Sequence, residues 1–218
     1  MPPASSKKST PPAGNLRSRQ KEERRTDILK AAITVMASKG YHQTRISDIA
    51  EEAGVAYGLV YHYFGSKDKI LSAVFESIWE RFSKRIEHIS SRNLTMEQKL
   101  VMIAMYMLNT YAARPDLIRL LVHEVVRARN IEDLEDMEIV RRIIGMIEDI
   151  CREGVERGEL YADADPRLHA LMFFGSVEMV LSALSSNLYD APRGAREVRA
   201  IKQKVKTFVL AGSFRMED

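Results

Sequence analysis

The sequence of 218 residues contains a single cysteine, Cys151, so it can form no internal disulfide bond. Its five histidines are dispersed, without the spacing of metal ligands: His42, His62, His88, His123 and His169. No histidine is evident near Cys151, and no glycine-rich loop of the kind that cradles phosphates occurs. We therefore predict no catalytic residue, no metal site and no cofactor, with a helical transferase as the enzymatic alternative.

The N-terminus has no apolar segment resembling a signal peptide, and a long uninterrupted apolar run is also absent. The most apolar stretch, residues 168–184, is short for a membrane span and is interrupted by His169, Ser176 and Glu178. We expect a cytoplasmic protein without a membrane partner, in which this stretch forms a buried interface helix.

The formal net charge of +3 is unevenly distributed. Residues 1–25 carry seven basic and two acidic side chains, whereas the remaining residues sum to −2. Prolines, serines and glycine among these first residues predict a disordered basic tail over residues 1–20. Such a tail could lie along DNA or could simply keep the protein in solution, and the sequence leaves both interpretations open.

Residues 27–70 show apolar spacing that is typical of short helices. Ile46, Ile49, Ala50 and Ala53 share one helical face, and Gly54 stands where a left-handed cap would end the helix. A second short helix follows, with Leu59, Val60 and Tyr63 facing inward, and residues 27–40 supply a third. This arrangement indicates a three-helix core built around a helix-turn-helix.

The outer face of the second short helix carries Tyr57, Gly58, Tyr61 and His62. Phenol and imidazole groups suit contacts with phosphate or base edges, and glycine leaves room for a DNA backbone. The alternative is a pair of stacked aromatic rings at a helix junction, which would need no DNA.

These residues carry a resemblance to the TetR family of transcriptional regulators. The resemblance covers residues 24–75 and lies in the following positions: Gly40-Tyr41, Thr44, Asp48-Ile49-Ala50, Ala53-Gly54-Val55, Gly58, Tyr61, Tyr63-Phe64 and Ser66-Lys67. It implies an all-α homodimer with a DNA-binding domain over residues 21–69 and a ligand-binding and dimerisation domain over residues 70–218. By position, the family's DNA contacts fall on Arg45, Ala56, Tyr57, Gly58, Tyr61, His62 and Lys67.

Two of these positions need comment. Ala56 stands where the family usually has serine or threonine, so a side-chain helix cap is missing there. Lys67 follows Ser66, the expected cap of the next helix, and could meet a phosphate together with the positive helix terminus. The alternative for Lys67 is a solvated surface lysine.

Beyond residue 89 the chain reads as helices with short breaks, without strand alternation. Thr95 with Gln98 forms a capping box, Pro115 starts a helix, Gly158 ends a long one, and Asp165 with Pro166 opens another. The predicted helices span about 95–112, 115–129, 134–157, 167–187 and 195–210.

The last two predicted helices are the expected dimer interface, as a four-helix arrangement of two helices from each protomer. The candidate interface residues are Phe174, Val177, Leu181, Leu184, Val198, Ile201, Val205 and Phe208. Spacing alone leaves open an intramolecular core. A two-fold dimer would place its recognition helices about one DNA turn apart and would read a pseudo-palindromic operator.

Long adaptable side chains in the C-terminal half suit a cavity for a flexible apolar effector, although core packing would also explain them. The candidate effector contacts are Met105, Tyr106, Asn109, Leu120, His123, Glu124, Arg127, Met172 and Phe173.

A second resemblance is to the acyl-CoA-responsive regulators of fatty-acid degradation within the TetR family. It lies in Gly40-Tyr-His-Gln, Gly158-Glu-Leu, Asp165-Pro-Arg-Leu, Phe174-Gly-Ser-Val-Glu and Leu188-Tyr-Asp190. It implies a long-chain acyl-CoA as effector, with Arg114, Arg119, Arg127 and Arg129 as candidates for the CoA phosphates. The alternative effector is an aromatic or cationic drug that controls efflux genes, bound through carboxylates and rings: Glu124, Glu178, Trp79 and Tyr106.

The sequence thus predicts a repressor that a small apolar effector releases from double-stranded DNA. The effector would act by favouring the dimer geometry that no longer matches successive major grooves. A helix-turn-helix that binds another protein remains the non-enzymatic alternative.

Overall fold

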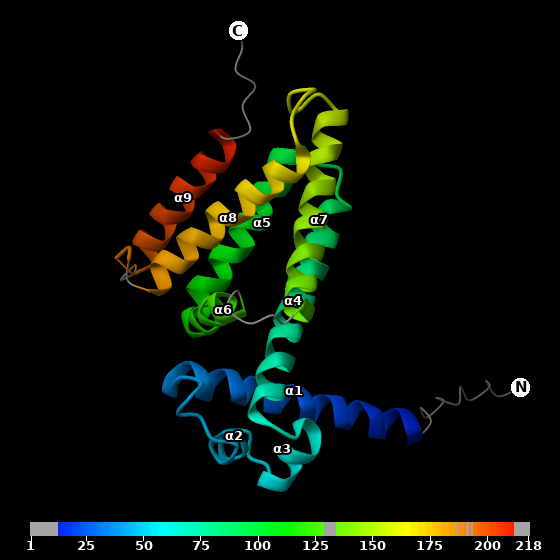
Figure 1. The fold of residues 1–218 in the computed structure, drawn as a ribbon, viewed down its shortest axis with the longest axis vertical. Coiled ribbons are helices and arrows are strands. Elements are labelled where there is room, and N and C mark those ends of the chain that lie inside the picture. Colours follow the sequence, from blue (N-terminus) through cyan, green and yellow to red (C-terminus); the bar gives the residue numbers. More distant parts are fainter. Residues whose placement is uncertain (1–12, 129–133, 187, 191, 193, 212–218) are drawn as a thin grey trace, which may run out of the picture. The chain divides into compact units, whose positions relative to one another are not determined.

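The structure, a computed structural model, describes residues 13–128, 134–186, 188–190, 192 and 194–211. Over these residues the chain is all-α, with nine helices and no strand, as the sequence predicts. It divides into two compact units, residues 1–74 and residues 75–218 (Figure 1). The division falls inside helix α4 (Lys67–Ser90), and the expected domain boundary after residue 69 lies within the same helix.

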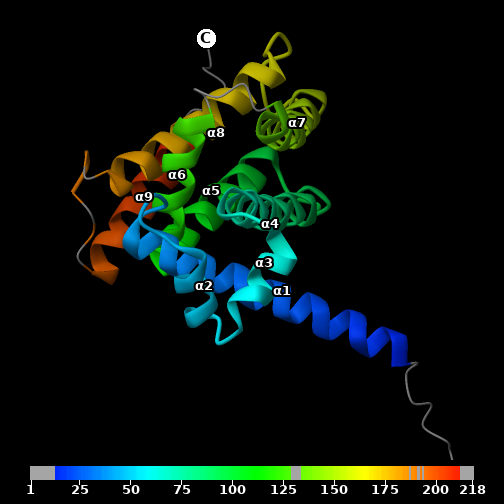
Figure 2. The same ribbon diagram turned by 60° about the horizontal axis from the view of Figure 1, so that its bottom comes forward.

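The first unit contains α1 (Ala13–Lys39), α2 (Ile46–Glu52), α3 (Tyr57–Phe64) and the start of α4. Helix α1 packs against α2, and α2 packs against α3 (Figure 2). Ile28, Ala32, Ile49 and Val60 are buried in its core, as predicted, whereas Leu59 and Tyr63 are only half-buried. This core holds α3 so that its other face is exposed.

The predicted disordered tail over residues 1–20 is wrong for residues 13–20, because α1 begins at Ala13. Five of the eight residues from 13 to 20 are alanine, leucine, arginine or glutamine, which favour helix. Residues 1–12 lie outside the described residues.

The second unit contains the rest of α4 and five further helices: α5 (Met96–Ala113), α6 (Pro115–Ala128), α7 (Leu134–Glu156), α8 (Pro166–Ser185) and α9 (Ala195–Ala211). Helix α8 packs against α5, α6 and α7, and α9 packs against α5 (Figure 1). The predicted caps are present: Thr95 accepts from the Gln98 N–H, and Asp165 accepts from the N–H groups of Arg167 and Leu168. Local capping chemistry therefore determines where these helices begin.

Helix α8 is long and apolar enough to cross a membrane by length and hydropathy alone, but the core helix of a soluble protein passes the same test. One side of α8 is buried, with Ala170 at 0% exposure and Val177 at 1%. Helices α5, α6 and α7 cover this side, while only 33% of the apolar stretch of α8 is buried, because the opposite side of the helix is exposed.

A buried ion pair joins the start of α5 to the end of α7. The side chain of Lys99 is 2% exposed, and its Nζ donates to Glu153 Oε2 at 2.5 Å. Glu153 also lies 2.5 Å from Arg157, and Lys99 is the largest cause that lowers the pKa of the Glu153 carboxyl below the ordinary value of 4.5. Glu159 Oε2 accepts from the backbone N–H of Met96 at 2.5 Å, so two carboxylates hold this junction.

Candidate DNA-binding surface and effector-binding sites

The turn between α2 and α3 has the geometry that the glycine pattern predicts. Gly54 has a φ of 64°, in the left-handed region. The Val55 N–H donates to the Ala50 carbonyl at 3.0 Å, and the Gly54 N–H donates to the Glu51 carbonyl at 3.0 Å. These two bonds form a Schellman motif, which ends α2 and turns the chain towards the start of α3.

The outer face of α3 is a candidate DNA-binding surface. Tyr57 is 54% exposed and Tyr61 is 57% exposed, with Gly58 and His62 also exposed on this helix. A Cβ added at Gly58 would meet no atom of the protein within 4 Å. On the inner face Val60 is 0% exposed and Phe64 is 7% exposed. The structure thus separates an apolar inner face from an outer face of phenol and imidazole groups.

Ala56 is the N-cap of α3. It forms no side-chain cap hydrogen bond, because a methyl group has no acceptor. Arg45 is the exposed N-cap of α2, and its backbone N–H donates to Asp48 Oδ2 at 3.0 Å. This bond, followed by Lys39 at 3.3 Å from Oδ1, lowers the pKa of the Asp48 carboxyl below its ordinary value of 3.8.

Lys67 has a structural role that the sequence does not reveal. Its Nζ donates to the carbonyl oxygens of Tyr41 at 2.9 Å and His42 at 3.3 Å, and it lies 4.4 Å from the centroid of the Tyr41 ring. The Tyr41 hydroxyl in turn donates to the Asp68 carboxylate. The loop between α1 and α2 is thereby attached to the start of α4, which Ser66 caps by accepting from the Lys69 N–H at 3.2 Å. The solvated-lysine interpretation of Lys67 is wrong.

The predicted effector contacts do not all come together. Met105 and Tyr106 are half-buried on α5, and Leu120 and Phe173 are buried. Met172, at 65% exposure, is on the outer face of α8, and Asn109 is also exposed, so neither lines the interior. The side chains of His123, Glu124 and Arg127 lie outside the described residues, as does Arg129.

The Tyr106 ring belongs to an aromatic cluster that also includes Trp79, Phe82 and Phe174. Tyr106 stacks on Phe82 with the centroids 5.9 Å apart and the planes at 5°. Trp79 and Phe174 lie 6.0 and 6.5 Å from the same Phe82 ring. Arg85, which sequence reasoning missed, has its guanidinium 5.7 Å from the Tyr106 centroid.

The predicted dimer residues divide between core and surface. Val177, Leu181, Leu184 and Val205 are at most 8% exposed within the single chain, which corrects the prediction for them: they form the intramolecular core that spacing alone left open. Phe174, Val198 and Ile201 are half-buried. Phe208 is 62% exposed.

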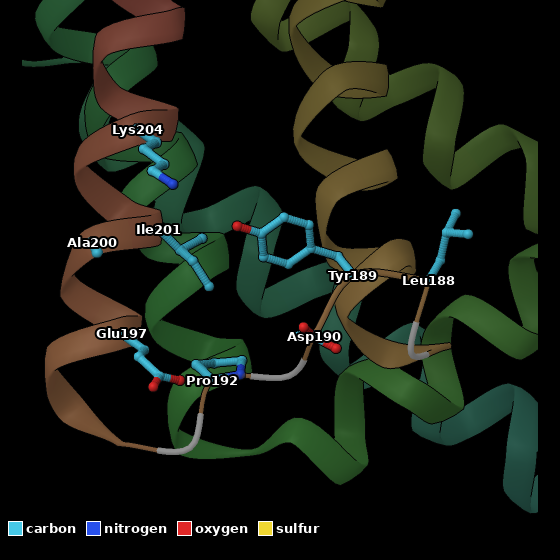
Figure 3. Close-up of a pocket in the computed structure, with 8 residues that line it drawn as sticks. All are labelled: Leu188, Tyr189, Asp190, Pro192, Glu197, Ala200, Ile201 and Lys204. Carbon is cyan, nitrogen blue, oxygen red and sulfur yellow. The ribbon is translucent and has the colours of Figure 1, made fainter.

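An apolar groove runs between α8 and α9, with a cavity volume of about 390 Å³ around Met179, Val180, Lys204 and Phe208. Towards the start of α9 a second hollow, of about 640 Å³, is bounded by Tyr189, Asp190, Glu197 and Lys204 (Figure 3). Met179 is 60% exposed. The outward side of α8 is thus apolar too. The sequence pattern alone could not separate these exposed residues, such as Met179, from those of the core.

Among the described residues, no group of three histidine, cysteine or acidic side chains could hold a metal ion. Cys151 is buried, and that burial, followed by the charge of Glu148, raises the pKa of its thiol to about 12. This thiol is part of the core and is not a nucleophile at neutral pH.

The exposed α3 surface on a compact helical unit, joined to a second all-helical unit, defines the chain as a helix-turn-helix DNA-binding protein. Residues 28–74 match the family model described as bacterial regulatory proteins of the tetR family, and residues 97–203 match the tetracyclin repressor-like C-terminal domain. The chain belongs to the TetR family of DNA-binding transcriptional regulators.

Similar proteins include the fatty acid metabolism regulator protein of Bacillus subtilis, 30% identical over 79% of this chain and 90% of the relative. The transcriptional repressor NicS of Pseudomonas putida is 26% identical over 74% of this chain and 77% of its own. Among solved structures, FadR from Bacillus subtilis in complex with stearoyl-CoA has a TM-score of 0.72 and 28% identity over 86% of this chain and 98% of that one. FadR from Bacillus halodurans has a TM-score of 0.73 and 28% identity over 87% and 99%.

Proposed function

We propose that this protein is a cytoplasmic transcriptional repressor that binds a pseudo-palindromic operator as a homodimer and is released from it by a long-chain acyl-CoA. The observation that carries the effector is the similarity over most of the chain to a regulator whose structure contains stearoyl-CoA. The exposed outer face of α3 supports the DNA-binding part.

On DNA, Tyr57, Tyr61 and His62 would enter the major groove, with Gly58 allowing the backbone of α3 to approach a phosphate. Arg45 would add a phosphate contact. The backbone N–H groups at the start of α3 would add others, because the side chain of Ala56 does not cap them. Lys67 has three N–H donors and uses two of them on the Tyr41 and His42 carbonyls, so one remains for a phosphate.

Exposed apolar side chains support homodimerisation through α8 and α9. Met179 and Phe208 line the α8–α9 groove, and Leu168, Leu171 and Met172 continue the apolar surface along α8. A second copy of the chain would cover this surface in an isologous contact, in which each α8 and α9 meets its symmetry mate. A two-fold axis would then set the two α3 helices about one DNA turn apart.

The aromatic cluster on α4, α5 and α8 favours an acyl-CoA over a cationic drug. Arg85 already lies against the ring of Tyr106, the position from which a cationic ligand would be attracted to that ring. A second positive charge there would be repelled. Arg114, one of the arginines considered for the CoA phosphates, forms a paired contact with Asp116 at 2.8 Å and is already neutralised.

The test combines operator selection with effector titration. DNA selected from random sequence by the purified protein should contain a two-fold-related site, and fluorescence anisotropy should show stearoyl-CoA releasing the protein from it. Chain-length-matched acyl-CoAs, CoA alone and a cationic aromatic dye complete the panel. Release by the dye and not by acyl-CoA would contradict the proposed effector, and asymmetric selected sites would contradict the dimer.

A further inference from the structure

We infer that Arg85, flanked by Arg81 and Arg92, forms a binding site for the anionic head of an amphipathic ligand along the edge of α4 that meets α5. The inference deepens the proposed function and rests on its effector half. Its basis is a group of guanidinium groups without carboxylate partners, beside the half-buried aromatic rings of the second unit.

The charges on the second half of α4 are segregated by sign. Arg81, Arg85 and His88 recur at intervals of four and three residues, which places them along one side of a helix, and Arg92 continues the series just past the helix end. The acidic residues Glu80 and Glu87 fall on another side. At a rise of about 1.5 Å per residue, the three arginines span roughly 16 Å. This length suits an extended anion that carries more than one charged group.

None of the three arginines forms an ion pair with a carboxylate among the residues that the structure describes. Arg81 donates only within its own helix, to the Ser77 carbonyl at 3.2 Å and the Ser77 hydroxyl at 3.3 Å. Arg92 Nη1 lies 3.5 Å from Met102 Sδ, a weak acceptor. By contrast Arg152 and Arg167 both pair with Glu148. Three guanidinium groups without a carboxylate partner among the described residues thus lie along one side of α4.

Arg85 is the central member of the group. Its Nε–H is buried with no hydrogen-bond partner among the described residues, and its guanidinium lies against the Tyr106 ring. A buried donor without an acceptor is unfavourable, because folding removes it from water without replacing the lost bond. An anionic ligand oxygen would supply that acceptor and would also neutralise the charge.

The groups beside Arg85 match the other half of an amphipathic ligand. Tyr106 stacks on Phe82, and the half-buried rings of Trp79 and Phe174 lie against the same phenylalanine. Met102, in contact with Arg92, extends the apolar side. Phosphates or a carboxylate would bind the arginines while an alkyl chain would pack among the rings and the methionine. Guanidinium groups beside aromatic rings suit an anion with an apolar chain and disfavour a cation.

Calorimetric titration of the full chain with stearoyl-CoA, CoA and stearate tests this site. We expect Arg85→Gln to weaken stearoyl-CoA binding by about tenfold, as for the loss of one charge-assisted hydrogen bond. Arg92→Gln, at an exposed position, should also weaken binding. Lys84→Gln is the matched control: it removes a positive charge one residue away, from a side chain already paired with Glu80 at 2.8 Å, and should change the affinity less than twofold.

The outcomes separate the two proposals. If the wild-type protein binds stearoyl-CoA and Arg85→Gln binds it equally well, the arginine site is overturned and the effector proposal stands. If the wild-type protein binds none of the three compounds, both are overturned. Weaker operator binding by Arg85→Gln without ligand would assign the arginines to the DNA surface instead. If Arg85→Gln weakens the binding of both stearoyl-CoA and CoA, the arginines recognise the phosphates. If it weakens the binding of stearoyl-CoA and stearate but not of CoA, they recognise the carboxyl end of the acyl chain.

Discussion

The ammonium of Lys67 donates to the carbonyl oxygen of Tyr41 at 2.9 Å while lying 4.4 Å from the centroid of that residue's ring. One side chain at the start of α4 thus holds both the backbone and the ring of the loop that precedes α2. Since α2 and α3 follow this loop, the contact positions the candidate DNA-binding surface in addition to any contact with phosphate.

Replacing Lys67 by methionine should therefore lower stability as well as DNA affinity. Two hydrogen bonds and a cation–π contact are lost, and we expect the free energy of unfolding to fall by about 1 kcal/mol. Thermal unfolding and operator binding at several salt concentrations measure the two effects. A lysine that only contacts a phosphate would leave stability unchanged and reduce the magnitude of the salt slope by about 0.9.

Gly58 and Gly54 should respond oppositely to alanine. Gly58 lies in α3 with open space around the added Cβ, so Gly58→Ala should stabilise the protein by about 0.5–1 kcal/mol and yet weaken operator binding if the DNA backbone approaches there. Gly54→Ala should cost about 1–2 kcal/mol, because φ is 64°. Chemical denaturation and anisotropy on one operator separate folding from binding. Unchanged operator affinity for a stable Gly58→Ala variant would remove Gly58 from the DNA surface.

The Lys99–Glu153 pair predicts unequal effects of its two partners. Lys99→Met should be nearly neutral, because Glu153 is partly exposed and keeps Arg157 at 2.5 Å. Glu153→Ala should cost about 2 kcal/mol, because it leaves the ammonium of Lys99 buried without a partner. Urea unfolding of both variants measures the difference, and equal losses would show that the pair acts only through packing.

The same pair predicts an acid dependence of stability. The pKa of Glu153 is lowered in the folded protein, so its stabilising contribution is present above the ordinary value of 4.5 and is lost as pH falls through the lower folded value. Melting temperatures measured from pH 7 to pH 3 should drop below about pH 4.5, and less steeply in Glu153→Gln. An identical acid profile for this variant would assign the loss to other carboxylates, of which Asp48 also has a lowered pKa.

Charge on the outer α8–α9 surface should separate the proposed dimer. Phe208→Glu introduces a carboxylate at a 62% exposed position beside Met179, where two copies would bring like charges together. Sedimentation velocity should show a monomer for this variant and a dimer for the wild type. Arg199→Glu, at an exposed position that does not line either groove, controls for added negative charge. A dimeric Phe208→Glu variant would move the interface elsewhere.

The boundaries of α5, α7 and α8 were predictable because local chemistry decides them, whereas the start of α1 at Ala13 was not. Thr95 and Gln98 satisfy each other's backbone groups, Asp165 caps α8, and Gly158 adopts a φ of 70° after α7. Each interaction lies within a few residues of the chain, so the sequence displays it directly. The helix-turn-helix was predictable for the same reason, since two short helices and a glycine turn form one contiguous motif.

The inward side of α8 was not predictable in the same way. Val177 is 1% exposed and Met179 is 60% exposed, yet both are apolar and lie two residues apart. Because α8 is apolar on both sides, its pattern cannot indicate which side meets α5, α6 and α7. The expected interface residues consequently included several that belong to the core.

Sequence by itself determined the all-helical class, the capped helix ends and the residues exposed on α3, because periodicity, capping and a positive φ at glycine act over a few residues. Only the tertiary structure decided the long-range partners: Lys67 with the Tyr41 carbonyl, Lys99 with Glu153, and Arg85 against Tyr106 without an acceptor. Burial and pairing depend on helices that come from distant parts of the chain, and no local pattern encodes them.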